Sequence, residues 1–156
     1  MHSTIRKIRR SANIGLYGSL GVSVATIALY VLWNYRFYAN ARGYQFMLVA
    51  GCVLAVLSIV TILFTVRKSV PRLRQNDDLE QKLSKYAEQT SNIYITTLAI
   101  VVVECVLLTL SHNSTLIMLL MLLVVLLFLL YPNMLKIKVD LGLSDEQMKT
   151  LFDDYE

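Results

Sequence analysis

Residues 116–130 read LIMLLMLLVVLLFLL, without one charged side chain. The stretch belongs to the last of four apolar runs, which occupy residues 14–33, 46–66, 93–110 and 115–135, the last interrupted by Pro132. Crossing a hydrocarbon core of about 30 Å takes about 20 residues in a helix. Strands of a membrane barrel alternate apolar and polar residues, and these runs do not. The sequence therefore predicts an all-α integral membrane protein with four transmembrane helices in an antiparallel bundle.

The composition supports this class. Hydrophobic residues make up 56% of the 156 residues and charged residues 17%, whereas a soluble domain has about 25% charged residues. The mean hydropathy is +0.55. Two cysteines are too few for a disulfide framework or a Cys-rich zinc site. These values exclude a disordered chain and argue against a water-soluble globule.

The basic residues predict the orientation. Of the 15 Lys and Arg, only Arg36 and Arg42 lie outside the segments 1–13, 67–92 and 136–156. By the positive-inside rule these three segments, and with them both termini, lie in the cytoplasm. The short loops favour a bacterial plasma membrane. The predicted domains are a basic cytoplasmic tail (1–13), a membrane domain (14–135) with a cytoplasmic helical segment (67–92), and a cytoplasmic tail with a short acidic helix (136–156).

The first apolar run also invites comparison with a signal peptide, because Ala39-Asn40-Ala41 resembles a cleavage site. The apolar part of a signal peptide spans about 7 to 15 residues, whereas this run is longer and is separated from the site by bulky residues. We therefore expect the run to remain as the first transmembrane helix.

Small residues indicate where the helices approach closely, because in lipid helices associate through close packing and interhelical hydrogen bonds. The predicted packing residues are Gly18, Gly21, Ala25 and Ala28 on the first helix, and Gly51 and Ala55 on the second. A neighbouring row on the first helix contains Gly15, Ser19 and Ser23. We expect an intramolecular contact between the first and second helices, and the alternative is the seam of a homodimer.

The cytoplasmic segments carry helical signals of their own. Leu79, Leu83 and Tyr86 recur at helical spacing, so the third helix is expected to extend into the cytoplasm. Its apolar edge can pack on its own bundle or on another protein. Ser144 followed by Gln147 predicts a capping box at the start of a short helix, which is either a docking segment or a fraying tail.

Two basic clusters are predicted to lie beside the inner leaflet, where each cation near anionic lipid contributes about 1 kcal/mol. The predicted lipid-contacting residues are Arg6, Lys7, Arg9, Arg10, Arg67, Lys68, Arg72 and Arg74. Because these residues adjoin membrane helices and no recognition motif accompanies them, no nucleic-acid partner is expected.

Glu104 is the only ionisable residue among the 80 residues of the four runs. An acid inside a membrane costs a few kcal/mol unless it finds a partner or gives up its charge. Counting from the outer end of its run places it about 10 Å deep, which makes Thr26 and Ser23 on the first helix the candidate partners. The functional interpretation is a proton-binding or ion-binding site. The alternative is a protonated carboxyl that fastens the third helix to the first by hydrogen bonds.

No catalytic residue, metal ligand or cofactor is predicted. The chain has two histidines, and its runs hold no paired acids, nucleophile elbow or phosphate-binding loop. We therefore expect a non-enzymatic multi-pass protein, an accessory or scaffold subunit that docks a membrane or cytoplasmic protein partner through its cytoplasmic segments. The alternative is a small oligomeric proton-linked or cation-linked transporter or channel that uses Glu104.

Overall fold

The computed structural model describes residues 2–32, 41–74, 78–111 and 113–152. These residues are almost entirely helical and form no strand, which confirms the all-α class. The helices are α1 (His2–Leu32), α2 (Ala41–Arg74), α3 (Leu79–Ser111), α4 (Ser114–Leu129), α5 (Met134–Leu141) and α6 (Asp145–Phe152).

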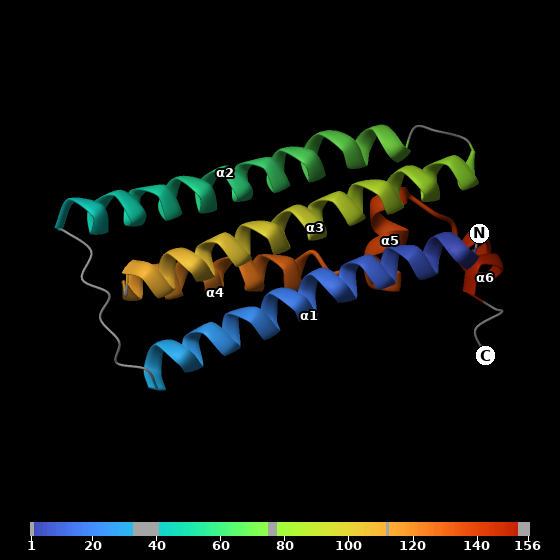
Figure 1. The fold of residues 1–156 in the computed structure, drawn as a ribbon. Coiled ribbons are helices and arrows are strands. Elements are labelled where there is room, and N and C mark those ends of the chain that lie inside the picture. The colour runs from blue at the N-terminus through green and yellow to red at the C-terminus, as the bar shows by residue number, and fades with distance from the viewer. Residues whose placement is uncertain (1, 33–40, 75–77, 112, 153–156) are drawn as a thin grey trace.

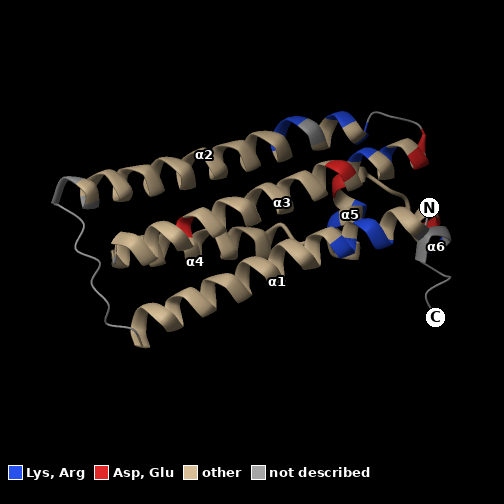
Figure 2. Cartoon of the chain, viewed as in Figure 1, with Lys and Arg blue, Asp and Glu red and all other residues tan. Residues whose placement is uncertain are grey.

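α3 is the central helix of the bundle (Figure 1). α1 and α2 lie on opposite sides of it, and α4 contacts all three of these helices. The N-terminus, α5 and α6 gather at one end, to which α2 and α3 also bring their charged segments. We call this the basic end, because Lys and Arg of the described helices cluster there (Figure 2). The structure thus brings the predicted basic segments together, and the side of a membrane that they face stays a prediction.

Three described helices, α1, α2 and α3, are long and apolar enough to cross a membrane. The expectation of one further helix over 115–135 is wrong, because α4 ends at Leu129 and α5 leaves it at an angle of 75°. Pro132 in the break has no N–H to continue the helix. Asn133 then caps α5, its Oδ1 accepting a hydrogen bond from the Lys136 backbone N at 2.7 Å. The described residues contain four candidate spans only if α4 and α5 together are counted as one bent span.

The three long helices extend well beyond their apolar runs. α1 includes residues 2–13, so the predicted basic tail is helical and continuous with the first run. α2 continues to Arg74 with Pro71 inside it. α3 begins at Leu79, well before its run starts at residue 93, which confirms the predicted extension of the third helix.

The expected contact between the first two helices is wrong, because α1 packs along α3 instead. Gly18 approaches the side chain of Leu98, whereas the other three residues of the predicted stripe, Gly21, Ala25 and Ala28, are exposed. The buried face of α1 is the neighbouring row: Ala12, Gly15, Leu16, Ser19 and Ser23. Gly15 sets the approach, since a Cβ there would lie 2.6 Å from the Cβ of Tyr94.

One hydrophobic core lies between the apolar segments and contains Val101, Leu108 and Leu116. A second hydrophobic core lies at the basic end. Its buried members are Ile5, Ile8, Leu73, Leu83, Tyr86, Ala87, Ile137, Leu141 and Leu143, with Leu79 and Met148 packed against it. The Tyr86 hydroxyl donates to Oδ2 of Asp140 on α5 at 3.0 Å. The apolar edge of the extended α3 therefore packs on its own bundle, which was one of the two expectations for it.

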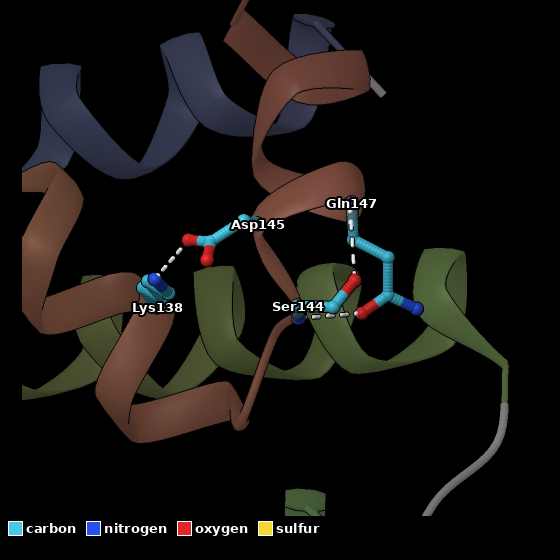
Figure 3. A network of polar contacts seen from close by, with 4 residues as sticks. All are labelled: Lys138, Ser144, Asp145 and Gln147. Atoms are coloured by element: carbon cyan, nitrogen blue, oxygen red, sulfur yellow. Dashed lines mark hydrogen bonds and ion pairs between the residues drawn. The ribbon is translucent and has the colours of Figure 1, made fainter.

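α6 begins with the predicted capping box (Figure 3). The backbone N of Ser144 donates to Gln147 Oε1 at 3.0 Å, and the backbone N of Gln147 donates to Ser144 Oγ at 3.2 Å. Beside it, the Lys138 ammonium on α5 pairs with the Asp145 carboxylate on α6. The capping box is confirmed, and the ion pair joins the two short helices.

The ion pair between α5 and α6 predicts a pH dependence. The hydrogen bond and the charge of Lys138 hold the pKa of Asp145 below its ordinary value of 3.8. A carboxyl with a lowered folded-state pKa stabilises the fold above its unfolded-state pKa, and that contribution is lost as pH falls through the lowered pKa. We therefore expect the contact to persist to below pH 3.8. An NMR titration of the Asp145 carboxyl carbon checks this: Lys138→Met should raise the midpoint towards 3.8, and an unchanged midpoint would contradict it.

Candidate functional site

Glu104 lies on the buried side of α3. Its side chain is 0% exposed, as are Val101 and Leu108 one turn to either side. Neither carboxyl oxygen has a hydrogen-bond partner among the described residues. Buried polar groups are nearly always hydrogen-bonded, and an unpaired buried charge costs several kcal/mol. The hydrogen-bonding capacity of this acid is thus unused by the rest of the described chain.

Gly51 on α2 makes room for the carboxyl. A Cβ at this position would lie 2.9 Å from Glu104 Oε2 and 2.6 Å from Leu116 Cδ2. Glycine at this position leaves room for the ends of these two side chains, which is the usual part of small residues in membrane bundles. Gly51 and Ala55 are both buried, as expected of packing residues. Gly51 serves contacts with α3 and α4, and it forms one wall of the carboxyl site.

The predicted partners Thr26 and Ser23 do not bind the carboxyl. Thr26 Oγ1 donates to the Val22 carbonyl of its own helix at 2.8 Å, and Ser23 Oγ is buried without a partner among the described residues. Both hydroxyls lie near the thiol of Cys105. Successive residues of an α-helix point about 100° apart, so Cys105 faces α1 while Glu104 faces α2. No hydrogen bond between described side chains therefore fastens α3 to α1 through Glu104.

Glu104 also stands apart from other potential ligands. In the part of the chain that the structure describes, no three His, Cys, Asp or Glu side chains come together in a way that could hold a metal ion. A single carboxyl can carry one proton. It can also bind one monovalent cation if hydroxyls, carbonyls or water supply further oxygen ligands. Intramembrane acids typically mark such proton or ion pathways.

A groove with a volume of about 300 Å³ lies between α2 and α3. Its apolar lining consists of Leu54, Leu57, Ile62, Ile93 and Ile100. Its polar lining consists of Ser58, Thr61, Thr65, Gln89, Asn92, Thr96 and Thr97. No ionisable side chain is among these lining residues. The volume is at the lower end of the range for small-molecule sites.

The groove lies along the line of contact between α2 and α3, which we call the seam, and Glu104 lies further along the same seam. α2 and α3 run antiparallel, and Gly51 lies beside Glu104. The groove is lined at its near end by Leu54 and Ile100, which stand about one helical turn, roughly 5.4 Å, from this pair. Thr97 lies inside the groove, two turns from Glu104. The polar residues of the groove that lie nearest to the carboxyl are therefore about two helical turns away. The side chains of Leu54 and Ile100 lie between them and the carboxyl.

The groove has a neighbouring cavity on the side of the basic end. A smaller cavity of about 30 Å³ shares Thr65 and Gln89 with the groove. Lys136 and Asp140 of α5 line its other side. Polar side chains therefore line the seam from the basic end to within about two turns of the carboxyl.

Sequence reasoning missed this groove, although a signal was present. Two polar stripes recur at helical spacing, Ser58, Thr61 and Thr65 on α2, and Gln89, Asn92 and Thr96 on α3. Ser and Thr in membrane helices commonly bond to the carbonyl of their own preceding turn, as Thr97 does to Ile93 at 2.8 Å. The stripes alone therefore do not distinguish a groove from satisfied hydroxyls.

The predicted lipid-contacting residues lie in the segments at the basic end (Figure 2). One of them, Arg9, is half-buried, and seven are exposed: Arg6, Lys7, Arg10, Arg67, Lys68, Arg72 and Arg74. Arg74 has a structural role, because its guanidinium donates to the carbonyls of Val139 at 2.7 Å and Asp140 at 3.2 Å. The last turn of a helix leaves such carbonyls without an internal partner. Contact of these residues with lipid stays a prediction.

The wall of the carboxyl site can be tested with two glycine substitutions. Gly51→Ala forces atoms of Glu104 and Leu116 to move, and overpacking of this kind costs about 1 to 3 kcal/mol. Gly21→Ala is the matched control, because a Cβ there meets nothing within 4 Å and alanine is favoured over glycine inside a helix by about 0.5 to 1 kcal/mol. Thermal unfolding in detergent should show a lower Tm for Gly51→Ala and an equal or higher Tm for Gly21→Ala. Equal Tm values for both variants would contradict the close approach.

The candidate site thus consists of one buried carboxyl, a glycine that makes room for it, and a groove that ends about one turn away. α2, α3 and α4 supply these parts from their apolar segments. No protein-family model, no curated protein and no solved structure matches this chain.

Proposed function

We propose that this protein is a small integral membrane carrier or channel in which Glu104 binds a proton or a monovalent cation in transit. The observation that carries the proposal is the fully buried carboxyl whose two oxygens have no partner among the described residues. Intramembrane acids are typical of proton relays and ion pathways. A carboxyl that only fastened helices together would need a hydrogen-bond partner on another helix, and neither Ser23 nor Thr26 is one.

The chemistry of a lone buried acid favours exchange. A protonated Glu104 is neutral, and an ionised one costs several kcal/mol in an apolar surrounding unless an opposite charge accompanies it. The proton therefore leaves readily only when a cation takes its place. The proposed transport is an exchange of one proton for one monovalent cation at the same carboxyl, with no net charge left in the bundle.

The seam between α2 and α3 is the proposed route to the carboxyl. Its hydroxyl and amide groups can replace part of the water around an entering ion, as polar pore linings do. Leu54 and Ile100 separate the groove from Glu104, so their side chains act as the proposed gate. In this proposal the basic end faces the cytoplasm of a bacterial cell.

A second candidate function is an accessory or scaffold subunit. It is favoured by the second hydrophobic core, which gives the basic end a fixed surface. The Tyr86–Asp140 and Arg74–Val139 hydrogen bonds hold α5 onto this core. Exposed basic residues on this surface suit an acidic protein partner. Docking of this kind does not require Glu104. A function that depends on Glu104 therefore distinguishes the carrier from the scaffold.

The Glu104→Gln variant tests the transport proposal, because it keeps the size of the side chain and removes its titration. In proteoliposomes with an internal pH-sensitive dye, the wild-type protein should let protons move in response to an opposing Na⁺ or K⁺ gradient. We expect Glu104→Gln to slow this flux at least tenfold. Glu88→Gln, which alters an exposed acid on the same helix, should retain wild-type flux.

Folding of both variants is checked by Tm and by elution volume in detergent. If the folded Glu104→Gln protein moves protons as fast as the wild type, the carboxyl has no part in transport. The scaffold candidate then remains.

A further inference from the structure

We infer that the groove between α2 and α3 binds an amphiphilic organic monocation, with its ammonium group directed towards Glu104 and its apolar part held between the helices. This inference rests on the proposed function, because it names the substrate class of the same carboxyl. Three features carry it: the mixed lining of the groove, its charge, and its opening to the side of the bundle.

The lining suits an apolar molecule with hydrogen-bond donors. Isoleucine and leucine side chains from both helices offer apolar surface, and hydroxyls and amides lie between them. The Thr97 hydroxyl already uses its hydrogen in the bond to the Ile93 carbonyl at 2.8 Å. Its oxygen therefore remains available as an acceptor. An ammonium group, which has only donors, matches this lining better than a carboxylate or phosphate, which has only acceptors.

The charge of the site selects a cation. No basic side chain lines the groove. Lys136 and Asp140, which line the adjoining cavity at its far end, carry opposite charges. Beyond the near end of the groove lies Glu104, whose oxygens have no partner among the described residues. A neutral or anionic ligand would leave this carboxyl as it is, whereas an ammonium group supplies both the opposite charge and the missing donors. The head group has to pass Leu54 and Ile100, and both of these side chains are only partly buried.

The groove opens sideways, towards the surroundings of the bundle. Leu57 on its rim is 57% exposed, and Thr61 beside it is also exposed. α2 and α3 are both apolar enough to lie in a membrane, so this rim faces acyl chains when they do. An amphiphilic cation dissolves in the bilayer and reaches such an opening from within it, which a small hydrated ion does not. We therefore assign entry to the bilayer side of the seam.

Octylamine, which is an ammonium ion at neutral pH, is the probe, and neutral octanol is its matched control. Equilibrium binding of the radiolabelled compounds is measured with the protein in lipid nanodiscs and corrected with empty discs. We expect saturable binding of octylamine only, with release of one proton per bound amine. Thr61→Phe, which fills the rim from an exposed position, should weaken binding at least tenfold, as should Glu104→Gln. Leu63→Phe, at a 53% exposed position outside the groove, should bind as the wild type does.

Three outcomes would overturn the inference. Equal binding of octylamine and octanol would show that the groove takes lipid-like chains without regard to charge. Unchanged octylamine binding by Thr61→Phe would place the amine elsewhere, and conversion of a dimer into a monomer by this variant would show that a second copy covers the groove. If the inference fails while proton flux in liposomes still depends on Glu104, the proposed function stands with a small inorganic cation. If octylamine binds as expected but flux does not depend on Glu104, the proposed function fails and the groove remains a binding site.

Discussion

The contact of α3 with every other long helix is the constraint on which the rest of this structure depends. Gly15 lets α1 approach Tyr94 of α3, and Gly51 lets α2 approach Glu104. The Tyr94 hydroxyl donates to the Leu127 carbonyl of α4 at 2.9 Å, which ties the fourth apolar segment to the same helix. Because lipid tails give helices little reason to associate, such close approaches and interhelical hydrogen bonds define the bundle. The buried carboxyl is held on this central helix.

α3 also joins two regions of different chemistry. One part of it carries Glu104 among apolar neighbours, and the other carries Leu83 and Tyr86 in the second core. A continuous helix of 33 residues has no flexible joint between them. α2 reaches the same two regions, because Gly51 lies beside Glu104 and Arg74 donates to the carbonyls of α5. The two proposed functions need not use separate parts of the molecule.

Several features were predictable from the sequence because they depend on local chemistry. The apolar runs gave the long helices, Ser144 and Gln147 gave the capping box, and a lone Glu104 in an apolar run had to be buried or paired. Other features depend on tertiary packing, which local patterns do not contain. The small residues of α1 predicted a close contact, but two adjacent rows carry such residues, and Tyr94 of α3 fits against Gly15 in the second. The partner helix and the correct row therefore could not be chosen from α1 alone.

The interruption at Pro132 was visible in the sequence, but the end of α4 at Leu129, the turn of 75° and the groove were not, for a related reason. Leu130, Tyr131 and Met134 continue the apolar character through Pro132, so hydropathy alone reads one unbroken segment. The backbone responds to the missing N–H of Pro132 and to the Asn133 cap. The groove arises because short side chains such as Ser58 and Thr61 do not fill the space between two helices. A residue pattern indicates polarity at these positions, whereas the unfilled volume depends on how far apart the helix axes lie.

The early end of α4 has a consequence for the bilayer itself. With 16 residues, α4 is about 24 Å long, whereas a typical hydrocarbon layer measures about 30 Å. In a bilayer, hydrophobic mismatch of this kind would be relieved by local thinning of the lipid. α5 is turned by 75° from α4, and its Leu135 and Val139 side chains are exposed. A membrane around this bundle would be thinner beside α4 than beside its three longer neighbours, which shortens the insulating layer on one flank of the protein only.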